Sequence, residues 1–342
     1  MILRMPEYCR SFRCSAGECS DSCCIGWEID IDEKTADYYM SVDGEFGERL
    51  KKGISAGDCY SFILDNERCP FLNDRNLCDI ILSLGEDKLC HICSEHPRYY
   101  EWFEGVKEGG VGLCCEEAAK LILARGGEDG YYETEIPCED CDEYDDELYR
   151  FLCEVRERMM DILREEASPR NSVERLLSYA SLIQERIDNG KTEEIPEVPS
   201  AAIADGKADI PHMLSIFRGL EPIDEKWKPY VDRLEEKASV AAHNEEHTKY
   251  IRNIGIYFIW RYFLKGVYDE EILSKVKLAV ISMAMTGLMF GAEEDAGMYR
   301  CAVLAKNYSK EIEYSEENLE ALYDMTYTEQ VFLNESLAAF FK

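Results

Sequence analysis

The segment CSAGECSDSCC (residues 14–24) places four cysteines within eleven residues, and further cysteines follow in short groups up to residue 115. Twelve of the sixteen cysteines of this 342-residue chain lie in its first third. They are Cys9, Cys14, Cys19, Cys23, Cys24, Cys59, Cys69, Cys78, Cys90, Cys93, Cys114 and Cys115. Such a concentration of thiols is typical of either a disulfide framework or a metal site.

The cellular compartment helps to choose between these two explanations. The N-terminal sequence MILRMPEYCRSF lacks the apolar core and the small-residue cleavage site of a secretory signal. The most apolar segment, LAVISMAMTGLMFGA (278–292), is shorter than the roughly 20 residues that span a bilayer, so it predicts a buried core helix. We therefore expect a cytoplasmic protein with no membrane segment. Because grouped cysteines in a reducing compartment bind metal more often than they form disulfides, the sequence favours a metal site.

The charge of the chain limits its partners. The formal net charge is −32 and the sequence pI is about 4.5. Nucleic acid and anionic membrane surfaces would be repelled, so we expect neither as a partner. A cationic partner, such as a lysine side chain on a protein substrate, would be attracted. The alternative is that the charge only keeps the protein soluble.

The pattern of apolar residues predicts a mainly α protein in three parts. Residues 1–125 form a cysteine-rich metal-binding region of irregular structure, because their apolar runs are short and interrupted. A bound metal would supply the folding free energy that such a region lacks. Residues 126–146 are acidic and turn-forming, which predicts a connector, and residues 147–342 form an α-helical domain.

Helical spacing is clearest in the second half of the chain. Apolar residues recur every three or four positions from Leu148 to Leu163, with Asp145 or Asp146 as the expected cap. Asn171 and Glu174 predict a capping box for a helix that ends at 189–190. Further helices are expected near residues 212–219, 224–242, 246–265, 270–290, 294–309 and 316–324. The segment 254–263 (IGIYFIWRYF) is apolar on nearly every side, so we expect it at the centre of the domain.

Three cysteine groups have the spacing of metal ligands. They are Cys14-x4-Cys19-x3-Cys23-Cys24, the CPFL element at Cys69 with Cys78, and Cys90-x2-Cys93. Structural zinc usually has two clean ligand pairs, which this spacing does not supply, so thiolates from scattered loops favour an iron–sulfur cluster. Zinc remains the alternative, and His91 or His96 could replace one sulfur. Adjacent pairs such as Cys23-Cys24 cannot easily bind one ion, so either one member packs or there are two centres.

Several catalytic motifs are absent from the sequence. The C-x3-C-x2-C loop of radical S-adenosylmethionine enzymes is missing, because Gly26 follows where the third cysteine would stand. There is no strand–GxGxxG–helix unit, no P-loop and no GxSxG element. The residues alone therefore predict a metal–thiolate protein on a helical body, without naming a reaction.

The order of the motifs resembles one family along almost the whole chain. The segments FRCSAGECSDSCCIGWEIDID (12–32), RCPFLNDRNLCDI (68–80), LGEDKLCHICSEHPR (84–98) and CCEEAAKLIL (114–123) are similar to the flagellin lysine N-methylases. The later segments YIRNIGIYFIWRYFLKGVYDEE (250–271) and YSEENLEALYD (314–324) resemble the helical half of that family. A more distant similarity is to zinc- or iron-chelating domains with a CxxCxxCC-type motif.

This resemblance implies methyl transfer from S-adenosylmethionine to lysine side chains of flagellin, with a cysteine-bound iron–sulfur cluster, of the 4Fe–4S type. Carried over by position, the metal ligands it implies are Cys14, Cys19, Cys23, Cys24, Cys69, Cys78, Cys90, Cys93 and Cys115. Where the family pattern has Ser-Cys-Pro-Glu, this chain has Cys114-Cys115-Glu116-Glu117, which leaves the role of Cys114 open. Cys138 and Cys141 could form an additional metal pair.

The same resemblance leaves the catalytic residues unknown. A lysine must lose its proton before it attacks, so Tyr99, Tyr100, Glu95 and Glu101 are candidate bases near the cysteines. Arg98 could bind the carboxylate of S-adenosylmethionine, or form an internal salt bridge. Trp27 could stack on the adenine of the cofactor, or pack the metal loop.

Two other classes of function stay open. The first is a metal- or redox-sensing protein, and the second is a binding scaffold held by structural zinc.

Overall fold

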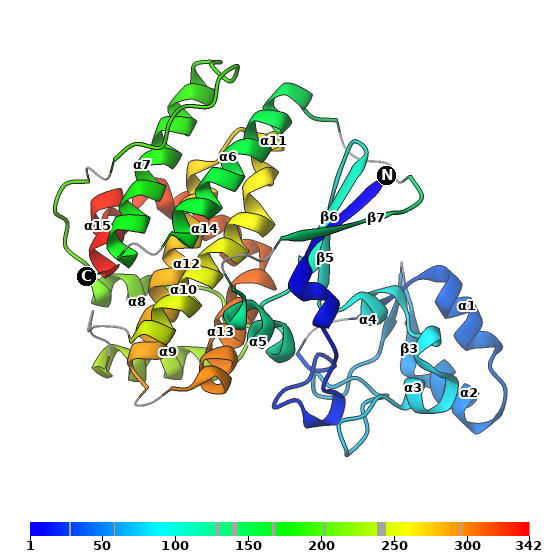
Figure 1. Ribbon diagram of the computed structural model, residues 1–342. Helices are drawn as coiled ribbons and strands as arrows, with labels where there is room; N and C mark the ends of the chain where they lie inside the picture. The colour runs from blue at the N-terminus through cyan, green and yellow to red at the C-terminus, as the bar shows by residue number, and fades with distance from the viewer. Residues whose placement is uncertain are drawn as a thin grey trace.

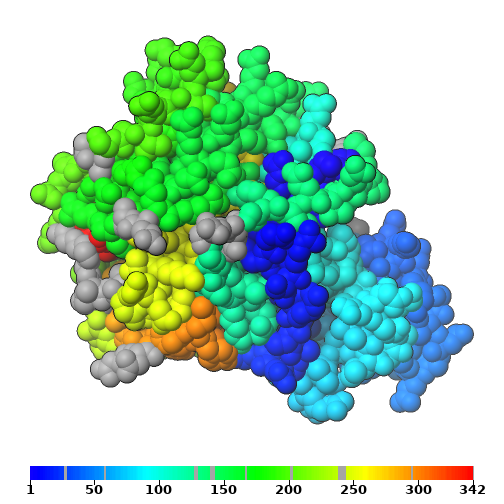
Figure 2. Space-filling model, in the orientation of Figure 1, coloured from blue at the N-terminus to red at the C-terminus, as the bar shows by residue number. Residues whose placement is uncertain are grey.

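The computed structural model describes every residue except 27–28, 58, 127–129, 139–142, 166–167, 201–202, 238–243, 294–295 and 342. The protein is mostly helical, as the sequence predicts (Figure 1). A large helical domain lies beside a four-stranded sheet, and a small lobe built from residues 29–95 lies below that sheet. The first 25 residues run between the lobe and the helices on the face shown in Figure 2.

The helical domain contains all the long helices that the apolar spacing predicts. They are α6 (Asp146–Arg164), α7 (Pro169–Asp188), α8 (Ile210–Gly219), α9 (Trp227–Lys237), α10 (Glu245–Tyr262), α12 (Leu273–Gly291), α13 (Met298–Glu313) and α14 (Glu316–Thr328). Short elements complete it: η4 (Phe263–Lys265), α11 (Gly266–Asp269), η5 (Gln330–Phe332), α15 (Asn334–Ala338) and η6 (Ala339–Phe341).

The caps of the first two helices test the sequence prediction directly. Asp145 caps α6, because its carboxylate accepts the backbone N–H groups of Glu147 and Leu148. The expected cap at Asn171 is wrong. Ser168 caps α7 instead, and its hydroxyl accepts the N–H of Asn171. Pro169 can then occupy the first turn, where no intrahelical N–H bond is needed.

Helices α10 and α12 form the centre of the domain. The segment 254–263 is buried almost throughout, which confirms the prediction that it is central. Helix α12 has the length and hydropathy to cross a bilayer, but 94% of its apolar window is buried inside the protein. It is therefore the buried core helix that its sequence predicts.

The expectation that the cysteine-rich part is irregular needs correction, because residues 1–135 contain two small sheets. The first has the strand order β5-β6-β1-β7, with β1 (Ile2–Pro6) parallel to β6 (Val106–Val111) and antiparallel to β7 (Tyr131–Glu135). Strand β5 (Arg98–Phe103) pairs antiparallel with β6. The second has the order β2-β4-β3, from β2 (Asp30–Ile31), β4 (Tyr60–Phe62) and β3 (Ile54–Ala56).

Short helices fill the rest of this part. They are η1 (Glu7–Ser11), η2 (Ala16–Glu18), α1 (Glu33–Ser41), α2 (Gly44–Gly53), α3 (Asp79–Leu84), η3 (Glu86–Lys88), α4 (His91–Glu95) and α5 (Glu116–Ala124).

Two hydrophobic cores hold the molecule together. The large core joins the helices to α5 and to the first sheet through Met5, Phe103 and Val111. The small core belongs to residues 29–93 and includes Cys69 and Cys90. The division of the chain at residues 125 and 146 stays a prediction, but the large core contains residues from both sides of it.

Candidate functional site

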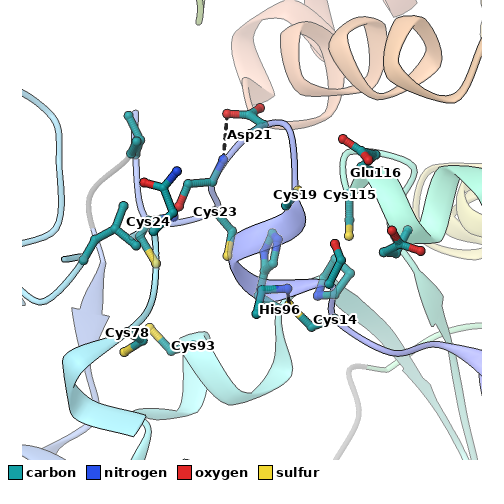
Figure 3. Close-up of a pocket in the computed structure, with 18 of the residues that line it drawn as sticks. Cys14, Cys19, Asp21, Cys23, Cys24, Cys78, Cys93, His96, Cys115 and Glu116 are labelled. Carbon is teal, nitrogen blue, oxygen red and sulfur yellow. Dashed lines mark hydrogen bonds between the residues drawn. The ribbon is translucent and has the colours of Figure 1, made fainter. Parts of the chain in front are cut away.

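A cavity of about 510 Å³ lies where the small lobe, the N-terminal loop and helix α13 meet (Figure 3). Its wall comes from residues 12–25, 72–98, 114–117 and 306–314. Eight cysteines line it: Cys14, Cys19, Cys23, Cys24, Cys78, Cys93, Cys114 and Cys115. Segments that lie far apart in the sequence therefore meet at one thiol-rich space.

Seven of the nine cysteines that we expect to bind metal line this cavity, and Cys114 lines it as well. The other two, Cys69 and Cys90, are buried in the small core. No disulfide joins any of the cysteines that the structure describes. In the part of the chain that the structure describes, no group of three or more His, Cys, Asp or Glu side chains is arranged to hold one metal ion. Metal binding by these thiols stays a prediction.

Five thiols form a first group, which we name the inner group: Cys24, Cys69, Cys78, Cys90 and Cys93. A hydrogen bond between the Cys93 and Cys90 thiols lowers the pKa of Cys90 and raises that of Cys93. Burial, together with the neighbouring charges of Cys24, Cys78 and Cys90, raises the pKa of Cys69 to about 12. Each member of the inner group is thus within electrostatic reach of several others.

Four thiols form a second group, which we name the outer group: Cys14, Cys19, Cys23 and Cys115. Burial, reinforced by Cys19 and Cys14, raises the pKa of Cys115 to about 11. Its thiol accepts the backbone N–H groups of Glu117 and Ala118 at the start of α5. Figure 3 shows Cys14, Cys19 and Cys115 on one side of the cavity and Cys24, Cys78 and Cys93 on the other, with Cys23 between them.

Ion pairs hold the N-terminal cysteine loop against the helical domain. Asp21 accepts from the ammonium groups of Lys306 and Lys310, each at 2.9 Å. Burial alone would raise the pKa of Asp21, but the two ammonium groups outweigh it and hold that pKa far below its usual range. The backbone N–H of Ser20 donates to Glu116 at 3.1 Å, which also ties the loop to α5. The position of the outer thiols therefore depends on α5 and α13.

The proposed cofactor-binding residues have different outcomes. Arg98 lines the cavity, and its guanidinium carbon lies 5.5 Å from the centre of the Phe12 ring. Trp27 lies outside the residues that the structure describes. His96 lines the cavity, and burial lowers its pKa to about 4, so its imidazole is neutral near pH 7. His91 is exposed and does not line it.

None of the four candidate bases lines the cavity. The Tyr100 hydroxyl donates to Glu95 at 2.8 Å, and this hydrogen bond follows burial as a cause of the raised pKa of Tyr100. Glu101 pairs with Lys265 at 2.6 Å. Burial raises the pKa of Tyr99 well above its ordinary value, so its hydroxyl stays protonated. The structure therefore does not place any of the four candidate bases at the cavity.

Sequence reasoning did not identify the residues that α13 brings to the site. Lys306, Lys310 and Tyr314 line the cavity, although nearly 200 residues separate them from Cys115. The spacing of Lys306 and Lys310 places both on one helical face, which is the only local signal of a shared role. Nothing in that spacing indicates that the face meets a cysteine loop.

The helical half of the chain, which supplies this wall, matches a known family. Residues 156–340 match the FliB lysine N-methylase C-terminal domain. The chain belongs to this family. The matched range includes α13, so the domain that defines the FliB family forms one side of the cysteine cavity. This confirms the family that the sequence motifs resemble.

Curated relatives of this FliB family member come from Salmonella. The flagellar biosynthetic protein FliU of Salmonella muenchen is 31% identical over 126 residues, which cover 34% of this chain and 75% of FliU. The lysine-N-methylases of Salmonella typhimurium strain LT2 and Salmonella choleraesuis strain SC-B67 are each 29% identical over 126 residues. The match covers 34% of this chain but only 31% of each of these two proteins. No solved structure matches the chain.

Proposed function

We propose that this cytoplasmic protein transfers methyl groups from S-adenosylmethionine to lysine side chains of a flagellin, and that its cysteines hold an iron–sulfur centre. The observation that carries the proposal is the cavity itself, where the family's α13 faces the thiols. The names of the Salmonella relatives, a flagellar biosynthetic protein and lysine-N-methylases, support the reaction and the acceptor.

The arrangement of the thiols supports an iron–sulfur cluster rather than a single zinc ion. Zinc needs four ligands within about 2.3 Å of one point, whereas a cluster binds its thiolates at separate iron atoms. Eight cysteines from separate segments line the cavity, which is twice the number of ligands that one zinc ion takes. The described cysteines form no disulfide, and thiols in this number also have the chemistry that iron–sulfur clusters require.

The charge of the cavity wall also suits an anionic thiolate centre. Four basic side chains line it, Arg13, Arg98, Lys306 and Lys310, together with four acidic ones, Asp21, Glu86, Glu116 and Glu117. In the whole chain 70 acidic residues outnumber 38 basic ones. The wall thus carries equal numbers of acidic and basic side chains, so it repels an anionic thiolate centre less than the strongly acidic rest of the protein would.

Two features of the wall fit the proposed substrates. The Arg98 guanidinium could bind the carboxylate of S-adenosylmethionine, which would supply the methyl group from its sulfonium. An incoming lysine would meet the Lys306 and Lys310 ammonium groups and the exposed Ile81 and Leu82 side chains near the cavity. Desolvation against the apolar side chains would favour the neutral amine, which is the form that attacks.

The test is a methylation assay on flagellin. We expect a mass gain of one methylene per modified lysine when flagellin is incubated with the anaerobically purified protein and S-adenosylmethionine. Cys115→Ser should reduce this gain, and Cys59→Ser is the control because Cys59 is exposed and lies outside the cavity. No mass gain, together with no binding of S-adenosylmethionine by calorimetry, would overturn the proposal.

A further inference from the structure

The number of thiols around the cavity exceeds what one cluster needs. A single 2Fe–2S or 4Fe–4S cluster is held by four cysteines. The inner group has five thiols and the outer group has four. Either most of these thiols only pack around one cluster, or the two groups bind separately.

Four of the five inner thiols belong to the small lobe, and Cys24 packs against its core. Cys90 is fully buried and Cys69 is 6% exposed, and both lie in the small core with Tyr39, Phe62 and Phe71. Cys24, Cys78 and Cys93 pack against the same core. Backbone N–H groups also reach these sulfurs: Phe71 donates to Cys69, and Ile80 and Ile81 donate to Cys78. Such bonds stabilise thiolate ligands.

The outer group belongs to a different part of the molecule. Cys115 precedes α5 and packs against the large core, not the small one. Cys14, Cys19 and Cys23 lie on the loop that Asp21 ties to α13. The outer thiols therefore stand between the N-terminal loop and the helical domain, whereas the inner thiols lie within the lobe or pack against its core.

The adjacent pair Cys23-Cys24 connects the two groups. Cys24 lies within electrostatic reach of Cys69, Cys78 and Cys93 of the inner group. The Cys23 thiol is hydrogen-bonded to the Cys24 thiol, and it also lies within electrostatic reach of Cys14 and Cys115 of the outer group. In Figure 3 the Cys24 sulfur faces Cys78 and Cys93, while Cys23 lies towards the centre of the cavity. Two neighbouring thiols that cannot easily share one metal can each bind a different one.

We propose that the protein holds two 4Fe–4S clusters, one bound by four of the five inner thiols and one bound by the outer thiols. The inner cluster stabilises the small lobe. The outer cluster lies beside Lys306, Lys310 and Tyr314 of the FliB family domain, where the methyl transfer would take place. This inference rests on the iron–sulfur part of the proposed function and not on the identity of the methyl acceptor.

The first measurement is the iron and acid-labile sulfide content of the intact protein, purified anaerobically or reconstituted. Two 4Fe–4S clusters give about eight irons and eight sulfides per chain, and a single one gives about four of each. About four irons at full reconstitution would overturn the proposal. Because this number comes from the unaltered protein, the result does not depend on whether any variant folds.

Paired variants then assign the two sites. Cys78→Ser with Cys93→Ser removes two inner thiols, and Cys14→Ser with Cys115→Ser removes two outer thiols, with Cys59→Ser as the control. We expect each pair to lose half of the iron and to keep a different electron paramagnetic resonance signal after reduction, while the control keeps both signals. Loss of all iron in a pair whose circular dichroism is unchanged would show that the groups share one cluster.

These results are separate from the proposed activity. Eight irons without methylation of flagellin would support the two clusters and overturn the proposed acceptor. Methylation of flagellin by a protein that holds about four irons would support the proposed acceptor and overturn the second cluster. Zinc in place of iron would overturn both the second cluster and the iron–sulfur part of the proposed function.

Discussion

The small lobe and the helical domain reach a folded state in different ways. The core of the small lobe has twelve buried residues, two of which are cysteines. The core of the helical domain is built from long helices, and α12 alone buries seventeen consecutive residues from Ser274 to Phe290. Because small units bury a smaller fraction of their surface than large ones, the lobe has less hydrophobic free energy available to it. We therefore expect the lobe to depend on its thiols for stability more than the helical domain does.

Removal of the proposed inner cluster should have the largest effect, and that effect should fall on the stability of the lobe. Metal–thiolate sites contribute on the order of 10 kcal/mol to the folding of small units. We expect a chelator under reducing conditions to make residues 29–95 susceptible to proteolysis. The helical domain should keep its circular dichroism and resist the protease. Equal resistance of both parts after complete metal removal would show that the lobe folds without metal.

The second prediction concerns the stability of the helical domain and tests a buried ion pair between α6 and the first sheet. The Arg156 guanidinium donates two hydrogen bonds to Glu108, at 2.6 and 2.9 Å, and both side chains are buried. Glu108→Gln leaves the Arg156 charge without its counterion and should reduce the free energy of unfolding by about 3–5 kcal/mol. Urea denaturation of the helical domain measures this loss.

The control for that prediction is the double variant Glu108→Leu with Arg156→Met, which removes both charges and should recover most of the stability. Proteolysis of the lobe should not change in either variant. A loss in the double variant as large as in Glu108→Gln would mean that packing, not charge, causes the effect.

The third prediction sharpens the comparison within the lobe. A Cβ on Gly53 would lie 2.8 Å from Cζ of Phe71, a buried ring in the small core. Gly53→Ala should therefore destabilise the lobe by about 1–3 kcal/mol through overpacking. Gly219→Ala is the matched control in the helical domain, because a Cβ added at Gly219 would meet no atom within 4 Å. Faster metal loss from the first variant but not from the second would support the prediction, and equal rates would contradict it.

The fourth and smallest effect concerns the contact between the two regions. The pKa of Asp21 is far below its usual value, so this contact contributes stability above the unfolded pKa of about 4 and loses it only at lower pH. Hydrogen exchange of residues 14–24, corrected for its intrinsic pH dependence, should therefore stay constant from about pH 8 to about pH 5.

Asp21→Asn should accelerate that exchange at every pH in this range, while global stability changes by about 1 kcal/mol or less because Asp21 is partly exposed. Asp37→Asn serves as a control, since Asp37 is an exposed acid on α1. Exchange that is insensitive to Asp21→Asn would mean that Ser20 and Glu116 hold the loop without it.

The helices could be predicted because each one repeats an apolar pattern within its own sequence. The strands could not, because their pairing is not local. Strand β6 reads VKEGGV, without clear alternation, and it pairs with β1 about 100 residues earlier in the chain. Its Glu108 points into a buried ion pair with α6, which no strand pattern indicates. The cap at Ser168 was missed because Asn171 offered an equally good local signal.

The candidate site was predicted in part for the same reason. Cysteine spacing identified six of the eight cysteines that line the cavity, because short spacings bring thiols together through local turns, and the family resemblance added Cys115. Arg98 was found through its motif, whereas Lys306, Lys310 and Tyr314 were not. Their contribution depends on where α13 packs.

The sequence by itself determined the helical class, the family and the presence of a thiol-rich site, since each of these is recorded in local spacing or in ordered motifs. Only the tertiary structure decided that cysteines of the N-terminal loop, the small lobe and the start of α5 meet at one cavity, and that α13 lines it. These features result from packing between segments distant in the chain. Such packing depends on complementary surfaces and buried charges, which no spacing along the sequence specifies.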